Sequence, residues 1–197
     1  MVKHVPKGQV NKKRVSFGRL EKVIKQMDEK YSIRVGLLGA NGAKKVEDTD
    51  LDMAALGAVH EFGATIQHKD STTIIPTRSF LRMPLLSSKG KQEVIKEVVK
   101  TLNIDSALKT DKNTPTEFQG VYEREIINTI SPKTLATAIG AKAYERVMKA
   151  FETDGFGNWE PTKPESRKQR KGSPDNPTLV DTGDMRDSIT FEIKKVS

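Results

Sequence analysis

Hydrophobic positions recur with a helical period along much of this chain. The longest such pattern follows Ser131-Pro132, a capping residue with proline at the first helical position, and continues to Phe151. A shorter pattern begins at Ser16 and continues to Met27. The same period predicts helices over residues 51–62, 78–86, 92–102 and 117–129. Thr49 or Asp50 could cap the 51–62 helix, which stops at Gly63.

Strand-like patterns occur at three places between these helices. Residues 32–38 put Ile33, Val35 and Leu37 on one face, and residues 188–194 alternate apolar and polar side chains. Residues 71–75 are rich in β-branched side chains. Strands separated by helices without regular alternation predict an α+β fold, a small antiparallel sheet packed by helices.

The ends of the chain interrupt this pattern in two ways. Residues 1–15 show no sustained period and are predicted to form an extended, basic N-terminal arm. Residues 16–197 then form a single α+β domain, with a long basic loop at 153–187 before the last strand. A connection of this length inside a compact domain is usually either functional or disordered.

The net charge of +8 is concentrated in two segments, residues 1–25 and 162–174. Basic segments of this kind favour a polyanionic partner such as nucleic acid, although they can also aid solubility or contact an acidic neighbouring subunit. For the loop, both a DNA-facing and a neighbour-facing orientation remain open, and we favour the neighbour. The residues expected to face a partner are Lys12, Lys13, Arg14, Arg167, Lys168, Arg170 and Lys171.

Several kinds of chemistry find no support in the sequence. The chain has no cysteine, which excludes disulfides, cysteine-based zinc sites and thiol nucleophiles. His60-Glu61 lacks the second histidine of a zincin site, and Asp181-Thr182-Gly183 is a single copy of a triplet that aspartic proteases need twice. No apolar run approaches the roughly 18 residues of a membrane span. We expect no enzyme activity, no cofactor, no metal and no membrane partner.

Two motifs remain that composition does not explain. The first is A-A-L-G-A-V-H-E-F-G-A, residues 54–64, followed by I-P-T-R-S-F-L-R, residues 75–82. The second runs from W-E-P-T-K-P-E-S-R-K to L-V-D-T-G-D-M-R-D-S-I, residues 159–189. In this order they resemble the tail-completion and virion-morphogenesis proteins of long-tailed bacteriophages, including the Mu-like group. The first 50 residues and residues 92–130 carry no signature of that family.

The resemblance implies a structural protein of the virion neck or tail, assembled in the host cytoplasm. It implies a ring, often a hexamer, that joins tail to head and contacts the head connector or neck and the tail tube or terminator. DNA passing through the channel would be bound without regard to sequence. The alternative is a stand-alone, sequence-nonspecific nucleic-acid-binding module.

Local physics suggests a role for each half of the first motif. Phe62 is expected to pack onto the sheet while Gly63 adopts a left-handed helix cap. Pro76 should end a strand, after which residues 79–81 start a helix on which Arg78 and Arg82 share a face.

In the second motif, Trp159 is expected to anchor the loop and Pro161 to give it an extended exit. Asp181 or Thr182 would cap a single turn that presents Arg186 outward. Fold maintenance and subunit contact both remain open for the motif residues, which are His60, Glu61, Phe62, Gly63, Pro76, Arg78, Phe80, Leu81, Trp159, Pro161, Asp181, Thr182, Gly183 and Arg186.

Overall fold

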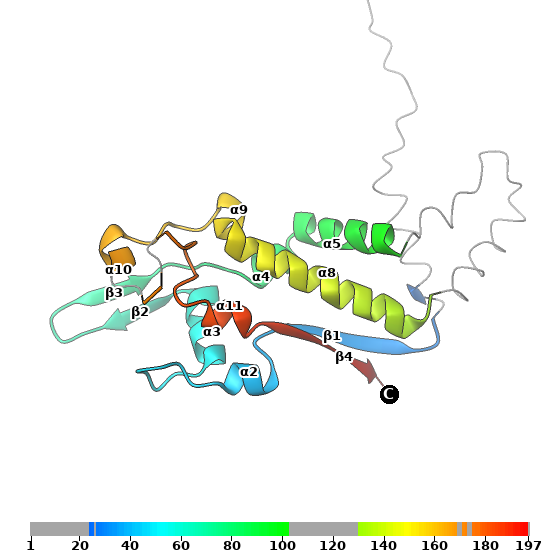
Figure 1. Ribbon diagram of the computed structural model, residues 1–197, viewed down its shortest axis with the longest axis horizontal. Coiled ribbons are helices and arrows are strands. Elements are labelled where there is room, and N and C mark those ends of the chain that lie inside the picture. The colour runs from blue at the N-terminus through cyan, green and yellow to red at the C-terminus, as the bar shows by residue number, and fades with distance from the viewer. Residues whose placement is uncertain (1–23, 26, 103–129, 169–170, 173–174, 197) are drawn as a thin grey trace, which may run out of the picture.

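The computed structural model describes residues 24–25, 27–102, 130–168, 171–172 and 175–196 (Figure 1). Helices and strands follow one another without regular alternation, so the fold is α+β, as predicted. The predicted arm, residues 1–15, and the predicted 117–129 helix lie outside the described residues. The elements are β1 (Lys30–Gly36), α2 (Gly39–Ala43), α3 (Met53–Phe62), β2 (Ala64–Gln67), β3 (Thr72–Ile75), α4 (Arg82–Leu86), α5 (Ser88–Thr101), α8 (Pro132–Glu152), α9 (Asp154–Gly157), α10 (Pro164–Lys168), α11 (Asp184–Asp187) and β4 (Thr190–Val196).

Helix α8 lies at the centre, with α5 on one side and the β1–β4 pair on the other (Figure 1). It begins as predicted: the Ser131 hydroxyl oxygen accepts a hydrogen bond from the Thr134 amide at 3.1 Å, and Pro132 takes the first helical position. Packing of its apolar face against both layers supplies most of the stability of such a helix. The buried residues of α8 are Leu135, Ala136, Gly140, Ala143, Val147, Ala150 and Phe151.

Strands β1 and β4 pair in antiparallel fashion, although they come from opposite ends of the described chain. Ile33 lies opposite Ile193, and Val35 lies opposite Phe191. A Cβ atom at Gly140 of α8 would lie 2.5 Å from the Phe191 ring, so glycine allows the sheet to approach the helix.

The strand predicted at 188–194 begins two residues later than expected. The amides of Ser188 and Ile189 still bond to carbonyls of the preceding helix α11, so these two residues cannot join the sheet. At the other strand, Leu38 caps α2, so β1 ends at Gly36 and not at Leu38.

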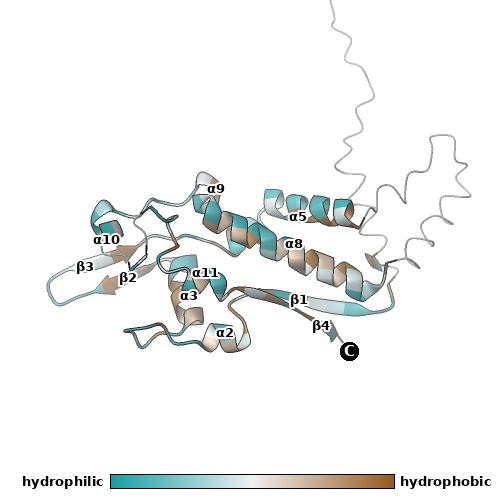
Figure 2. Cartoon of the chain, in the orientation of Figure 1, coloured by the Kyte–Doolittle hydropathy of each residue, from teal (hydrophilic) through white to brown (hydrophobic). Residues whose placement is uncertain are grey.

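A second antiparallel pair, β2 and β3, forms a hairpin that projects from the body (Figure 1). The sequence analysis missed β2, whose four residues are too few to show a period, and it predicted one sheet where the described residues form two. Hydrophobic residues appear on both strands of the hairpin in Figure 2, and the Ile74 side chain is 71% exposed.

The predicted helices 78–86 and 92–102 have different boundaries in the structure. The first begins only at Arg82, because the preceding amides bond to a side chain described below. The second begins at Ser88, where the Ser87 hydroxyl accepts a bond from the Gly90 amide at 3.0 Å. Val98 and Val99 of α5 then pack with Leu135 of α8 in a second apolar cluster.

In its described part, the segment predicted as a long loop, residues 153–187, contains three short helices, α9, α10 and α11. The main core joins this segment to α3 and α8 through a set of buried side chains, among them Met53, Phe80, Val147, Phe151, Trp159, Leu179, Met185 and Ile189. Within the described ranges, no helix has the length and apolar character needed to cross a membrane.

Candidate functional site

Helix α3 carries the first half of the first motif, and its start differs from the prediction. Asp52, and not Thr49 or Asp50, caps the helix: its Oδ1 accepts a hydrogen bond from the Ala55 amide at 2.8 Å. The Val46 amide bonds to the Leu51 carbonyl, so the intervening residues form a closed turn and the helix begins only after it.

The C-terminal end of α3 is fixed by Gly63, which has a φ of 74°. A Cβ atom at this position would lie 2.9 Å from the Ile75 carbonyl oxygen and 2.9 Å from the Thr77 hydroxyl. Glycine therefore lets the chain turn directly from α3 into β2 while β3 passes close by. Pro76 ends β3 as predicted, and the Thr77 hydroxyl donates a hydrogen bond to the Phe62 carbonyl at 2.9 Å.

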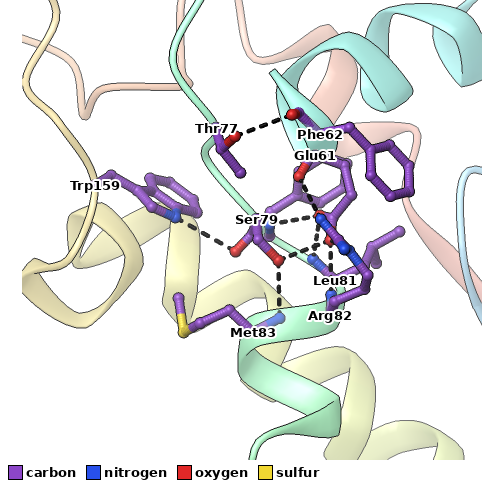
Figure 3. Close-up of polar contacts among 9 residues, drawn as sticks. Glu61, Phe62, Thr77, Ser79, Leu81, Arg82, Met83 and Trp159 are labelled. Atoms are coloured by element: carbon purple, nitrogen blue, oxygen red, sulfur yellow. Dashed lines mark hydrogen bonds and ion pairs between the residues drawn. The ribbon is translucent and has the colours of Figure 1, made fainter.

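Glu61, in the last turn of α3, is only 3% exposed, and its carboxylate is the centre of the site (Figure 3). It accepts hydrogen bonds from three consecutive backbone amides, those of Phe80, Leu81 and Arg82, at 2.8 to 3.0 Å. The Ser79 hydroxyl donates a bond at 2.7 Å and Arg82 Nε donates another at 2.9 Å. Glu61 thus caps helix α4 from a distant element and satisfies amides that have no partner within that helix.

Two opposing effects set the pKa of Glu61. Burial raises the pKa, whereas the bonds from the Leu81 amide, the Ser79 hydroxyl, the Arg82 amide and the Arg82 guanidinium lower it. The hydrogen bonds outweigh burial, so the pKa lies below its ordinary value and the carboxylate is ionised near neutral pH.

The second motif meets the first at the same place. The indole Nε1 of Trp159 donates to the Ser79 carbonyl oxygen at 3.3 Å (Figure 3). Arg78, which is 7% exposed, donates from Nε to the Glu160 carbonyl at 3.0 Å and from its amide to the His60 carbonyl at 2.8 Å. The motif residues of α3, of the 75–82 segment and of the 159–160 turn therefore form one unit.

Aromatic side chains form the apolar floor of this unit. The rings of Phe80 and Phe151 have centroids 5.3 Å apart, and Phe151 meets Trp159 edge-on at 5.8 Å. Phe80 and Phe151 are fully buried and Trp159 is 6% exposed, which confirms that Trp159 anchors the following segment. Pro161 lies exposed in the irregular stretch between Trp159 and α10.

Three expectations for the first motif are wrong. Gly63 has a positive φ of 74°, but its ψ of 166° lies far from left-handed helical values, so it does not form the expected left-handed cap. Phe62 does not pack onto a sheet: it is 61% exposed, and the Arg82 guanidinium lies 4.2 Å from its ring centroid. Arg78 and Arg82 do not share a helix face, because α4 begins only at Arg82 and Arg78 lies in the irregular stretch before it. Among the residues of this unit, sequence reasoning missed Ser79 and Arg82 as ligands of Glu61, since their pairing depends on contacts about 20 positions away.

The remaining motif residues surround α11. Gly183, with a φ of 96°, is the N-cap residue of the helix, so the prediction of Asp181 or Thr182 as the cap is wrong. The Thr182 hydroxyl oxygen, one residue earlier, accepts a hydrogen bond from the Asp184 amide at 3.3 Å. Asp181 instead accepts a bond from the Gly172 amide at 2.8 Å. Arg186 bonds to the neighbouring Asp187 at 2.7 Å and is partly exposed. Asp181, Thr182 and Gly183 line a groove together with residues of α3, and Glu61 is not among the residues that line it.

The structure describes the side chains of only two of the basic residues that were expected to face a partner, Lys168 and Lys171. Lys171, predicted to face a partner, bonds within its own chain to Glu47 Oε2 and Asp48 Oδ2, each at 2.9 Å. Lys168 is exposed at the end of α10. The side chain of Arg167, and the residues Lys12, Lys13, Arg14 and Arg170, lie outside what the structure describes.

His60 is the most perturbed histidine of the site. Burial, together with the nearby charge of Arg78, lowers its pKa from 6.5 to about 4, and its Nδ1 is buried without a hydrogen-bond partner among the described residues. Within the same residues, no group of three His, Asp or Glu side chains is placed to hold a metal ion. The five donors to the Glu61 carboxylate all come from residues 79–82, so these bonds hold that segment against the end of α3.

The comparisons with known proteins do not extend this picture: no family model, no curated protein and no solved structure matches the chain.

Proposed function

We propose that this chain is a structural assembly protein of a tailed-bacteriophage virion, of the neck or tail-completion type. In this proposal it forms a ring, with a hexamer as the favoured size, that joins tail to head around the DNA channel. Its partners are further copies of itself, the head connector or neck, and the tail tube or terminator. The proposed role is architectural and calls for neither a catalytic residue nor a cofactor.

The observation that carries the proposal is the meeting of the two motifs on which the resemblance rests. Glu61 from the first motif and Trp159 from the second both bond to Ser79, although Ser79 and Trp159 are 80 positions apart. The motif residues therefore share a physical purpose, which is to fix one buried framework. This purpose suits an architectural subunit better than an enzyme, whose reactive groups need an accessible substrate site.

Features of the surface support assembly into a larger structure. Each of the two described sheets has only two strands, so every strand has one edge without a partner strand among the described residues. The projecting hairpin exposes Ile66 and Ile74, at 42% and 71%. Unpaired edges and exposed apolar side chains are features that a neighbouring subunit can cover.

The proposal is tested by the mass of the assembled species. We expect native mass spectrometry of the full chain to show a ring whose population grows with concentration, and electron microscopy to show an open centre. Antibody labelling should place the protein at the head–tail junction of purified particles. A protein that stays monomeric at all concentrations and is absent from the particles would contradict the proposal.

A sequence-nonspecific nucleic-acid-binding module is the second candidate, because the net charge of +8 is concentrated in two segments. The bonds of Lys171 to Glu47 and Asp48 weaken this candidate, since they occupy a cation that DNA phosphates would need. A salt titration of DNA binding by the isolated subunit separates the two candidates. Submicromolar affinity at physiological salt would favour the module.

A further inference from the structure

The two strands of the projecting hairpin carry no charged residue and no proline (Figure 1). Strand β2 has the sequence A-T-I-Q and β3 the sequence T-T-I-I, and most of these side chains are exposed. Natural proteins protect the open edges of a sheet with charged side chains or proline, because an unprotected edge pairs with further strands. Strands β1 and β4 do carry such charges, at Lys30, Arg34, Glu192, Lys194 and Lys195. The edges of the hairpin are therefore the ones suited to pairing.

Hydrogen bonds hold the hairpin at its base and near its tip. The Thr77 hydroxyl donates to the Phe62 carbonyl at 2.9 Å, which ties together the segments on either side of the two strands. Nearer the tip, the Thr72 hydroxyl donates to Gln67 Oε1 at 2.8 Å. The hairpin thus presents preformed edges, which lowers the cost of ordering them in a contact.

The hydrogen-bond pattern determines which backbone groups point outward from each edge. The His68 amide donates to the Ser71 carbonyl at 2.8 Å, so these two residues form a hydrogen-bonded pair of the antiparallel ladder. Bonded and non-bonded pairs alternate along such a ladder, and the amides and carbonyls of the non-bonded pairs point away from the partner strand. In the register of this hairpin the residues with outward groups are Thr65, Gln67, Thr72 and Ile74.

The outward groups of the two edges match one another. They are two residues apart on β2 and two residues apart on β3, so the β3 edge of one copy can pair with the β2 edge of the next. In that arrangement Ile74 lies opposite Thr65 of the second copy, in the same register as within the hairpin. All four residues are exposed, and neither edge has a partner strand among the described residues.

The turn of the hairpin adds charge complementarity to this match. Lys69 lies on the β2 side of the turn and Asp70 on the β3 side, and both are exposed. Neither forms an ion pair or a side-chain hydrogen bond within the described part of the chain. When β3 of one copy lies beside β2 of the next, Asp70 meets Lys69 of that next copy. An antiparallel pairing of β3 with itself would point the two tips in opposite directions, and a parallel one would bring two Asp70 side chains together.

We propose that the hairpins of neighbouring copies join edge to edge, β3 of one copy to β2 of the next. The contact is head-to-tail, so its repetition closes a ring and builds one continuous antiparallel sheet within it. Closure leaves no hairpin edge open and covers part of Ile74, which is 71% exposed in the single subunit. The inference rests on the proposed ring and names the contact that closes it.

Disulfide crosslinking tests the register of this contact, because the chain has no cysteine of its own. Thr73 lies opposite Ile66 of the next copy in a non-hydrogen-bonded pair, where the Cα atoms are about 4.5 Å apart and a disulfide fits. Subunits carrying Thr73→Cys are co-expressed with subunits carrying Ile66→Cys and mildly oxidised. We expect a band of two linked chains from this mixture.

No band should form from either cysteine variant alone, or when Lys96→Cys on α5 replaces Ile66→Cys. Absence of the band from the Thr73→Cys and Ile66→Cys mixture would overturn the proposal. A band from Thr73→Cys alone would also overturn it, since it would show that β3 pairs with β3.

A charge exchange at the turn tests the complementarity. Lys69→Asp places two acidic side chains together at each contact, and Asp70→Lys places two basic ones there. Each single variant should weaken the subunit contact about fivefold, the upper figure for an exposed ion pair, whereas the double variant should restore it. Lys96→Glu, a charge reversal on the exposed side of α5, is the control and should leave the ring population in native mass spectrometry unchanged. A double variant that assembles no better than the single ones would contradict the proposed pairing.

Loss of one outward amide separates this inference from the proposed function. The Thr72 amide points away from β2, so Thr72→Pro removes no hydrogen bond inside the hairpin but takes a donor from the contact with the neighbour. We expect the full chain to form rings and the Thr72→Pro chain to remain monomeric with an unchanged circular dichroism spectrum. If the Thr72→Pro chain still forms rings, the edge contact is wrong while the ring stands. If the unsubstituted chain never assembles, the proposed function itself fails, and this contact with it.

Discussion

At the Glu61 carboxylate, five hydrogen bonds converge on two oxygen atoms. A buried carboxylate is tolerated only when hydrogen bonds replace its lost hydration. Three of the donors are consecutive backbone amides, so the side chain dictates the path of the chain into α4. A single residue of the first motif thereby sets the geometry of the whole 79–82 segment.

Glu61→Gln should lower the free energy of unfolding by about 3 kcal/mol. The amide group of glutamine would place a donor against backbone donors, and the charge that strengthens the remaining bonds would be lost. Urea denaturation of the purified chain measures this change. Glu145→Gln, on the solvent side of α8, should change the same quantity by less than about 0.5 kcal/mol.

The lowered pKa of His60 predicts a loss of stability in mild acid. The folded protein binds a proton at His60 only near pH 4, whereas the unfolded chain binds one near 6.5. Between these values the unfolded state holds more protons, so stability falls as the pH falls. We expect a decrease in the free energy of unfolding of about 2 kcal/mol between pH 7 and pH 5.

Urea denaturation at the two pH values measures this decrease, and His60→Gln should largely remove it. The exposed His68 provides the matched control, since His68→Gln should retain the decrease. Equal decreases in the wild-type chain and in His60→Gln would show that another group is responsible. Glu61 acts in a lower window: its folded pKa is lowered, so its stabilising contribution is complete above the ordinary pKa of 4.5 and is lost as the pH falls below that value.

Among the elements, α9 shows how a short turn positions the second motif. Asp154, Gly155, Phe156 and Gly157 all have positive φ angles, between 48° and 76°. This left-handed stretch reverses the chain directly after α8 and brings Trp159 back onto Phe151. Its two glycines differ in their surroundings, which gives a matched pair for testing.

Gly155→Ala should destabilise the protein by about 3 kcal/mol, since strain at a φ of 64° adds to an overpacked contact. The added Cβ would lie 2.3 Å from the indole Nε1 of Trp159. Gly157 has a similar φ of 76° but open space around it, so Gly157→Ala should lower the free energy of unfolding by only about 1 kcal/mol. Thermal denaturation of both variants measures the difference. Equal costs would mean that the Trp159 contact does not constrain the turn.

At the scale of the whole molecule, the described chain has a layered body and one projecting hairpin (Figure 1). The body buries many of its apolar residues in two clusters, whereas the hairpin leaves Ile66 and Ile74 exposed, at 42% and 71%. An exposed β-branched residue on a projecting strand adds little to the stability of the isolated subunit. Its burial requires a neighbour.

Ile74→Thr should therefore weaken assembly of the proposed ring without changing the fold. Threonine keeps the β-branched shape that strands favour but removes apolar surface. We expect the unfolding free energy of the monomer to stay within about 0.5 kcal/mol of wild type while the ring population falls in native mass spectrometry. A ring population equal to that of wild type would show that the hairpin tip lies outside the subunit contacts.

The sequence by itself determined the elements whose signals are local. Ser131-Pro132 and a 3.6-residue period sufficed for α8, and alternation sufficed for β1 and β4 to within two residues. The same signals predicted the α+β class. These features depend on backbone preferences and on side-chain periods that can be read within a short window of the sequence.

Only the tertiary structure decided which segments meet. No residue near Glu61 in the sequence indicates that Glu61 caps α4 some 20 residues later. Likewise, the residues of β1 do not indicate that β4, more than 150 positions away, is its partner strand. The exposure of Phe62 and the four-residue strand β2 likewise follow from their surroundings and not from their own residues. Long-range hydrogen bonds and packing are chosen by the complete set of contacts, so they become visible only when the chain is folded.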